Sequence, residues 1–264
     1  MSATSGDASA RPAGKQPQAH VVWHDLECGT YSADLPLWRQ LADTTVPAPG
    51  SAPILDVGAG TGRVSLDLLR RGHSMTALDV DPDLLGALRR RAGAGAIATV
   101  CADARELDLA EKDFALVLVP MQTLQLFGGS TQRRAFLARA HAHLRPGGLL
   151  ACAIVTALEP FDVAAGDPPA PVERTRTGGM LFESRARSVR IAGQAIVIER
   201  ERRIRAEHEH AKPPASVRDI VTLDRLESSR LRCEGTAAGF AAAGTLHVPA
   251  TEDHVGSTVV VFRV

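Results

Sequence analysis

The chain has 264 residues, of which 45% are hydrophobic. It is therefore long enough to bury one sizeable core, and it fits one domain with an insertion better than two equal domains. Thirty basic residues balance thirty acidic ones, which excludes an overall positive field for a nucleic-acid backbone and leaves only a local patch open. We expect a small or neutral partner and no nucleic acid.

Residues 1–19 are polar and contain no apolar run of the kind that signal peptides and membrane anchors carry. We expect this tail to be disordered, the protein to be cytoplasmic, and no membrane to be a partner. The cysteines lack the paired spacing of a zinc site, so we predict free thiols in a reducing compartment. They are Cys28, Cys101, Cys152 and Cys233. No pattern indicates the oligomeric state.

Residues 20–46 contain both tryptophans and the only tyrosine of a chain with 4% aromatic residues. The second half of this segment has helical spacing at Leu35, Trp38 and Leu41. We predict that it packs on the main domain as a lid or leading helix.

Strand and helix patterns alternate from Ile54 onward, which is typical of a parallel sheet. Asp81 and Pro82 look like the N-cap and first residue of a helix. The strands are expected at 53–57, 74–80, 96–103, 114–119 and 149–155. Five β–α units in succession predict a doubly wound sheet.

The pattern changes at residue 160, where period-two alternation at 179–191 and 194–210 predicts an antiparallel hairpin. We predict that residues 160–212 form a small antiparallel β insertion over the active site. A helix is expected from Leu223 to Phe240, followed by a final antiparallel strand pair. The predicted fold is a Rossmann-like, doubly wound, seven-stranded α/β sheet, with residues 47–159 and 213–264 forming the ligand-binding domain.

The sharpest motif is DVGAGTG at residues 56–62, between a buried strand and an amphipathic helix. Glycines at this position let a ligand approach the backbone closely. A dinucleotide fold requires G-x-G-x-x-G, but here the third glycine comes one residue early and Arg63 takes the next position. The spacing therefore argues against a nicotinamide cofactor.

With this motif the sequence resembles the class I S-adenosylmethionine-dependent methyltransferases, whose first motif has the form ILDVGAGTG. The resemblance continues in order through most of the chain, and LRPGG at 144–148 matches the turn before the fifth strand. It implies that S-adenosylmethionine is bound and S-adenosylhomocysteine is the product. The implied cofactor-binding residues are Tyr31, Asp56, Gly58, Ala59, Gly60, Gly62, Asp79, Val80, Asp103, Ala104, Pro120, Met121 and Gln122.

Individual roles also follow from the resemblance. Asp79 would accept hydrogen bonds from both ribose hydroxyls, as a carboxylate can, and Val80 would lie beside the adenine. Asp103 would bond the adenine amino group, next to the Ala104 amide. Residues 120–122 would line the methionine moiety and the methyl group.

Each of these residues also has a purely structural interpretation. An aspartate at a strand end often caps a helix or starts a turn, which applies to Asp79 and Asp103. Met121 could simply fill the core. Tyr31 would close over the cofactor, as an N-terminal tyrosine does in the family, or would only pack in the lid, and Trp23 and His24 belong to the same candidate group.

Methyl transfer requires a base when the acceptor is a hydroxyl or an ammonium. The connection between the two final strands should return over the carboxyl edge of the sheet, where ligands bind. We therefore predict His254 as a general base with Asp253 as its orienting partner, against the alternative of a solvated loop. His208 and His210 share one face of a strand but have no third ligand, so we expect no metal site.

The sequence as a whole predicts an enzyme that methylates an oxygen or nitrogen centre of a small molecule. Methylation of RNA or protein is the closest alternative, and a surface with clustered arginines would favour it. A non-methylating protein that binds S-adenosylmethionine on the same fold is the alternative from another class. The sequence names no acceptor.

Overall fold

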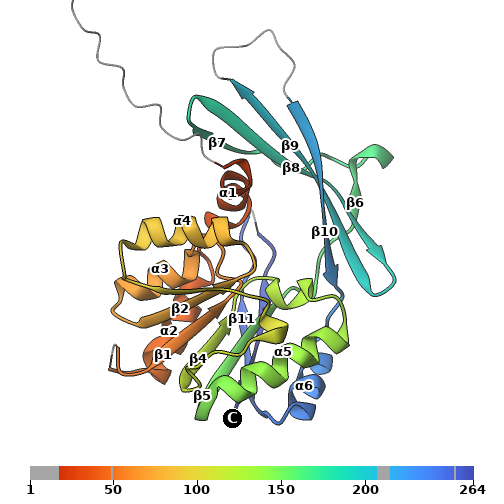
Figure 1. Cartoon of the computed structure of the whole chain (residues 1–264). Coiled ribbons are helices and arrows are strands. Elements are labelled where there is room, and N and C mark those ends of the chain that lie inside the picture. The colour runs from red at the N-terminus through yellow and green to blue at the C-terminus, as the bar shows by residue number, and fades with distance from the viewer. Residues whose placement is uncertain (1–17, 49, 207–214, 253) are drawn as a thin grey trace, which may run out of the picture.

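The computed structural model describes residues 18–48, 50–206, 215–252 and 254–264, and it contains two β-sheets (Figure 1). The helices are α1 (Ala19–His24), α2 (Leu35–Thr45), α3 (Arg63–Arg70), α4 (Pro82–Ala92), α5 (Ser130–His143) and α6 (Ser228–Ala237). The shorter helical turns are η1 (Asp25–Gly29), η2 (Ala104–Glu106), η3 (Thr123–Leu126) and η4 (Val163–Ala165).

The first sheet has seven strands in the order β11-β12-β5-β4-β1-β2-β3. Its strands are β1 (Pro53–Val57), β2 (Ser74–Asp79), β3 (Ala98–Cys101), β4 (Phe114–Val119), β5 (Leu144–Ile154), β11 (Ala241–Val248) and β12 (Ser257–Arg263). The strands β1 to β5 are parallel, and β12 and β11 add an antiparallel pair. The predicted fold class is therefore confirmed.

The centre of this sheet is buried on both faces, as its continuous apolar runs require. All six residues of β4 are buried. On one face Val117 packs in a cluster with Phe136 of α5, and on the other Leu116 packs in a cluster with Leu68 of α3. The helices on both faces leave the carboxyl ends of the strands as the free edge where ligands bind in such sheets.

The connection between β11 and β12 reaches that same edge. Thr258, near the start of β12, pairs with Ile154 at the end of β5. Because β5 ends there, residues 249–252 and 254–256 lie at the carboxyl edge, where we predicted the connection that carries His254.

The second sheet is antiparallel and has the order β10-β9-β8-β6, with β7 paired to β8. Its strands are β6 (Phe161–Asp162), β7 (Glu173–Thr177), β8 (Met180–Ala192), β9 (Ala195–Ala206) and β10 (Ala215–Asp224). It extends away from the first sheet, with α1 between the two (Figure 1). The predicted hairpin corresponds to β8 and β9.

Residues 215–224 differ from the prediction. We expected the insertion to end at 212 and a helix to begin near Leu223, but β10 continues the second sheet to Asp224 and α6 begins only at Ser228. The reason is packing, because Leu223 is buried against Val189 and Ile196 of the same sheet. The sheet therefore includes a segment that we had assigned to the main domain.

One glutamine joins the two ends of the insertion to the first sheet. Gln125 is fully buried, and its Nε2 donates to the carbonyl oxygens of Val155 (3.0 Å) and Asp224 (2.9 Å). Its Oε1 accepts from the Val155 amide at 2.8 Å. The chain leaves the first sheet just after β5, at Val155, and returns at Asp224. Gln125 therefore holds together the two chain segments that connect the second sheet to the first, which we call the stalk of the second sheet.

The N-terminal segment forms α1, η1 and α2, as the predicted lid or leading helix requires. Val22, Trp23 and Leu26 pack against Phe182 of the second sheet. The rings of Trp23 and Phe182 meet edge to face, with centroids 5.0 Å apart. The predicted disordered tail lies outside the described residues except for 18–19, where α1 begins.

Candidate functional site

The glycine loop follows β1 at the carboxyl edge of the first sheet. Gly58, Gly60 and Gly62 have φ angles of 72°, 55° and 96°, which L-residues with side chains rarely adopt. A Cβ atom on Gly58 would lie 2.5 Å from Cγ2 of Thr123, and one on Gly60 would lie 2.3 Å from Nε2 of His24. Glycine is therefore required here both by conformation and by space.

Backbone hydrogen bonds connect this loop to β2. The amides of Gly58 and Ala59 both donate to the carbonyl oxygen of Leu78, at 2.8 and 3.0 Å. The Gly60 amide donates to Oδ2 of Asp79 at 2.8 Å. The structure thus brings the glycine motif and the predicted ribose-binding aspartate into direct contact.

Asp79 ends β2 and is partly exposed. Its Oδ1 accepts from the Asp81 amide at 2.9 Å, so each oxygen has one backbone partner and a lone pair free for a further hydrogen bond. The capping role belongs instead to Asp81, which begins α4. Val80 is 68% exposed, which leaves a large apolar side chain available to a ligand beside Asp79.

Asp56 is buried in the strand below the loop. Its Oδ2 accepts from the Ser65 hydroxyl at 2.6 Å, while its Oδ1 has no hydrogen-bond partner within the described part of the chain. Burial raises the pKa of Asp56 from 3.8 to about 6, although the Ser65 hydrogen bond opposes the shift. A carboxylate that is costly to bury, with one oxygen unsatisfied, is typical of a functional position.

We expect Asp56→Asn to change how stability depends on pH. The folded-state pKa of Asp56 lies above its unfolded value, so its contribution to stability falls as the pH rises from about 4 to about 6. A pKa shift of about two units corresponds to ~3 kcal/mol of folding free energy. Asp56→Asn should therefore be more stable relative to the wild type at pH 7 than at pH 4, by up to about this amount. Urea unfolding at both pH values measures this difference.

Asp67→Asn is the matched control, because the Arg39 guanidinium lowers the pKa of Asp67. With a lowered pKa, the contribution of Asp67 to stability rises with pH only below about pH 4, so its replacement should show no recovery between pH 4 and pH 7. A parallel loss or gain in both variants would contradict the assignment to Asp56.

Asp103 follows β3 and starts the short helical turn η2. Its Oδ1 accepts from the backbone amide of Arg105 at 2.8 Å, and the Arg105 side chain forms an ion pair with the same carboxylate. Asp103 therefore does start a turn, which was the structural interpretation that the sequence left open for it. Ala104 is buried within the turn, and adenine binding by the pair stays a prediction.

The loop after β4 contains residues 120–122. Pro120 is buried, and Met121 and Gln122 are half-buried. Met121 has a φ angle of 55°, a positive value that no other non-glycine residue of the described chain has. Non-glycine residues in this conformation are strained and cluster at functional sites. The lining of the methyl site by this loop stays a prediction.

Tyr31 and His254, which we predicted separately, lie together. Their ring centroids are 4.8 Å apart. The Arg63 guanidinium lies over the Tyr31 ring, 5.2 Å from its centroid. Arg63 Nη1 also donates to the Tyr31 carbonyl oxygen at 3.0 Å. Asp253, the predicted partner of His254, lies outside the described residues. Within the described residues, His254 contacts the Tyr31 ring, and its pairing with Asp253 stays a prediction.

Two acidic side chains of the turn η1 hold the N-terminal segment in place, and the sequence analysis did not single them out. Asp25 accepts from the Thr61 hydroxyl of the glycine loop at 2.7 Å and forms an ion pair with Arg91 of α4. Burial alone would raise the pKa of Asp25, but the hydrogen bonds from Arg91 and Thr61 lower it. The carboxylate is therefore held in its charged form against the loop.

The second anchor is Glu27, which contacts the other sheet. Its Oε1 and Oε2 accept from Arg202 at 2.8 and 2.6 Å, and Oε1 also accepts from the Ser184 hydroxyl at 2.6 Å. Bidentate pairs of this kind are the strong form of the ion pair. The turn η1 thus fixes the second sheet relative to the glycine loop.

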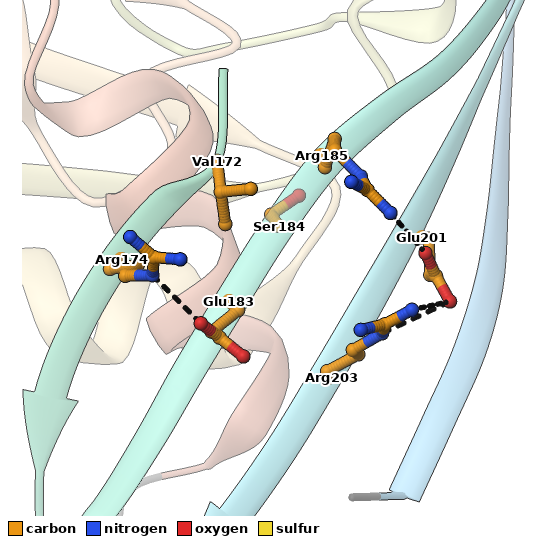
Figure 2. Close-up of a pocket in the computed structure, with 7 residues that line it drawn as sticks. All are labelled: Val172, Arg174, Glu183, Ser184, Arg185, Glu201 and Arg203. Carbon is orange, nitrogen blue, oxygen red and sulfur yellow. Dashed lines mark hydrogen bonds and ion pairs between the residues drawn. The ribbon is translucent and has the colours of Figure 1, made fainter. Parts of the chain in front are cut away.

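A cavity of about 170 Å³ lies on the second sheet, and none of the residues that line it belongs to the glycine loop (Figure 2). Its lining residues are Val172, Arg174, Glu183, Ser184, Arg185, Glu201 and Arg203. Figure 2 shows that the arginines point toward the glutamates: Arg174 donates to Glu183 at 2.7 Å and Arg203 to Glu201 at 2.8 Å. Its three arginines share two glutamates, because Arg185 and Arg203 both pair with Glu201, and ion pairs of this kind by themselves indicate no particular ligand.

One group of side chains has donor atoms close enough for a metal ion. His20, Asp81 and Asp83 place them within 4.8 Å of one another. Asp81 already accepts from the Asp83 and Leu84 amides as the cap of α4, and His20 is exposed. These local roles account for the group without an ion. The pair His208 and His210 lies outside the described residues.

Residues 54–148 match the family model described as a methyltransferase domain. The demethylmenaquinone methyltransferases of Tropheryma whipplei strains Twist and TW08/27 are each 28% identical to this chain over 113 residues. The match covers 43% of this chain and 46% of each relative, so the chain spans about half the length of these curated relatives.

Solved structures share the fold along nearly the whole chain. A sugar N-methyltransferase from Streptoalloteichus sp ATCC 53650 has a TM-score of 0.69 at 16% identity, covering 100% of this chain and 99% of that one. An amino pentose methyltransferase from Micromonospora echinaspora has a TM-score of 0.67 at 20% identity, covering 94% and 97%. At such identities the likeness shows the fold, and its extent includes the second sheet.

Among the helices of the described residues, none has the length and apolar character needed to cross a membrane.

Proposed function

We propose that this chain, whose residues 54–148 form a methyltransferase domain within a class I fold, transfers a methyl group from S-adenosylmethionine to an oxygen or nitrogen atom of a small molecule. One observation carries the proposal: the Gly60 amide donates to Asp79 at 2.8 Å, so the glycine loop and the acidic strand end form one site. The sites of ligands in doubly wound sheets lie at this edge.

The residues present fit the cofactor. Gly58 and Gly60 leave no room for side chains, Asp79 keeps lone pairs for a diol, and Val80 offers an exposed apolar surface. The buried, unpartnered Oδ1 of Asp56 would be stabilised by a nearby cationic group, which the methionine moiety of S-adenosylmethionine carries. A nicotinamide cofactor has no comparable fit, because Arg63 is bound to Asp34 at 2.9 Å where a third glycine would be needed.

S-adenosylmethionine supplies an activated methyl group on a sulfonium, so the protein's task is chiefly to position the acceptor. Asp79 would hold the ribose, and the turn η1, anchored by Asp25 and Glu27, would help to shield the loop from water. His254, placed against Tyr31, would take the proton of an acceptor hydroxyl as the oxygen attacks, or the proton of an acceptor ammonium before the freed nitrogen lone pair attacks; the methyl–sulfur bond would break with its electron pair left on sulfur. In this proposal the Tyr31 ring helps to orient the imidazole, while the predicted partner Asp253 lies outside the described residues.

The choice of a small-molecule acceptor has two supports. The structural relatives named above are a sugar N-methyltransferase and an amino pentose methyltransferase. The three arginines around the cavity of the second sheet all pair with Glu183 or Glu201, so only one net positive charge remains there for an RNA backbone. Methylation of RNA or protein is therefore the second candidate.

Calorimetric titration with S-adenosylmethionine, S-adenosylhomocysteine and NADH tests the proposal. Both sulfur ligands should bind and NADH should not, and small amines and alcohols should then accept methyl groups. Failure of both sulfur ligands to bind would contradict the cofactor assignment. Tight binding without transfer to any acceptor would favour a non-methylating protein on the same fold.

Asp79→Ala is expected to weaken S-adenosylhomocysteine binding by on the order of 10- to 100-fold. The physical reason is the loss of charge-assisted hydrogen bonds to the ribose, which contribute roughly 1.5–3 kcal/mol. Calorimetry measures the affinity. Asp83→Ala is the matched control and should leave the affinity unchanged. The partly exposed carboxylate of Asp83 lies in the first turn of α4, against His20. Equal affinities of the wild type and Asp79→Ala would remove Asp79 from the site.

We also propose that the protein acts in the cytoplasm. All four cysteines are free, which supports a reducing compartment. Fractionation of the cells that make the protein tests this location.

A further inference from the structure

His24 lies directly over the glycine loop. A Cβ atom on Gly60 would be 2.3 Å from His24 Nε2 and 2.4 Å from its Cε1, so the imidazole edge packs on the Gly60 backbone. The same Gly60 donates its amide to Asp79. His24 therefore stands beside the carboxylate that we assign to the ribose.

The surroundings of His24 hold it at this place. The next residue, Asp25, is bound to Thr61 and Arg91, and the preceding residue, Trp23, packs against Phe182 of the second sheet. His24 ends α1 at the point where the π-helical turn η1 begins. Single π turns inside α-helices are frequent at functional sites because they re-aim one side chain.

The two ring nitrogens of His24 differ in their environment. Nδ1 lies 3.4 Å from the Thr61 hydroxyl, whereas Nε2, which faces Gly60, has no hydrogen bond within the described residues. Burial lowers the pKa of His24, although Asp25 and Asp79 oppose the shift. The ring is therefore neutral at pH 7, can both donate and accept, and does not repel a cationic ligand.

We propose that His24 is a cofactor-positioning residue whose Nε2 forms a hydrogen bond with a ribose hydroxyl next to Asp79 and so couples cofactor binding to the N-terminal segment. This inference rests on the proposed function. It assigns a specific ribose contact to one nitrogen atom of a residue that the sequence only placed in the same candidate group as Tyr31.

Binding of S-adenosylhomocysteine by three variants tests the proposal. His24→Ala should weaken binding by about 3- to 10-fold, the effect of one neutral hydrogen bond. His24→Gln places an amide near the position of Nε2 and should restore most of the affinity, whereas His24→Asn mimics Nδ1 and should not. His20→Ala, on the same helix but exposed and paired with Asp83, is the control and should bind like the wild type.

Ribose analogues separate a hydrogen bond from simple packing. For either the 2′-deoxy or the 3′-deoxy form of S-adenosylhomocysteine, the wild type and His24→Ala should bind equally, because the hydroxyl that His24 contacts is missing. An equal loss in His24→Ala for both analogues and the parent ligand would overturn the proposal, as would full affinity of His24→Ala. If the wild type itself does not bind S-adenosylhomocysteine, the proposed function fails instead.

Discussion

Arg133→Met is expected to lower the free energy of unfolding by about 3–5 kcal/mol, because it leaves a buried carboxylate without its main partner. Arg133 on α5 donates to both oxygens of Glu234 on α6 at 2.8 Å, and Glu234 is only 1% exposed. Arg133 also forms an ion pair with Asp224 at the end of β10. The replacement therefore loosens the helix pair and the stalk of the second sheet together. Urea unfolding measures the change.

Two further variants decide whether the buried charge is the cause. Adding Glu234→Gln to Arg133→Met should recover part of the loss, since the unpaired charge is removed. Arg230→Met is the matched control, because Arg230 bonds the same carboxylate at 3.2 Å from the surface and should contribute only ~0–1 kcal/mol. A double variant that is less stable than Arg133→Met alone would contradict this explanation.

The parallel half of the fold could be predicted because its signals are local. The apolar runs of β1 and β4, the glycine loop and the cap at Asp81 each follow from a few neighbouring residues. The return of the β11–β12 connection over the carboxyl edge followed from the pairing of antiparallel strands. The contact between Gly60 and Asp79 was predictable for the same reason, since Asp79 ends β2 and Gly60 lies in the loop that follows the neighbouring strand β1.

The end of the insertion was mispredicted because its signal is not local. Val221 and Leu223 have the alternation of a strand, but the edge strand β10 also exposes Val217 and Ile220. Only the presence of β9 as a hydrogen-bonding neighbour decides between strand and helix there. Secondary structure that depends on a distant partner overrides the local pattern.

The anchors of the N-terminal segment were missed for a related reason. Glu27 contacts Ser184 and Arg202, which lie more than 150 residues further along the chain. A single glutamate in a polar stretch carries no sign of such a partner. The only available signal was the concentration of aromatic residues around it, which marked the segment as packed but not the residues that hold it.

His254 illustrates how the structure changes a hypothesis without removing it. The sequence suggested a carboxylate at Asp253 as the orienting group, by analogy with His–Asp pairs. The structure places the imidazole against the Tyr31 ring at a tilted angle, and the Arg63 guanidinium lies over the same ring, so His254 contacts the N-terminal segment directly. Closing the N-terminal segment would then also orient the base.

His254→Asn is therefore expected to lower kcat for an oxygen or protonated nitrogen acceptor by about 100- to 10,000-fold, the usual contribution of a general base. The affinity for S-adenosylhomocysteine should stay within about twofold, because the contact with the acceptor rather than the cofactor is lost. Added imidazole should restore part of the rate if the lost group acts by taking a proton. Single-turnover transfer from S-adenosylmethionine and calorimetry measure the two effects.

His247→Asn is the matched control, since His247 is exposed on β11, in the strand that leads into the same connection. It should leave both the rate and the affinity unchanged. Tyr31→Phe keeps the ring against His254 and should retain most of the activity, whereas Tyr31→Ala should lose rate in the direction of His254→Asn. An unchanged kcat in His254→Asn would mean that the acceptor reaches the site already deprotonated. The contact between Tyr31 and His254 would then serve to hold the N-terminal segment in place rather than to move a proton.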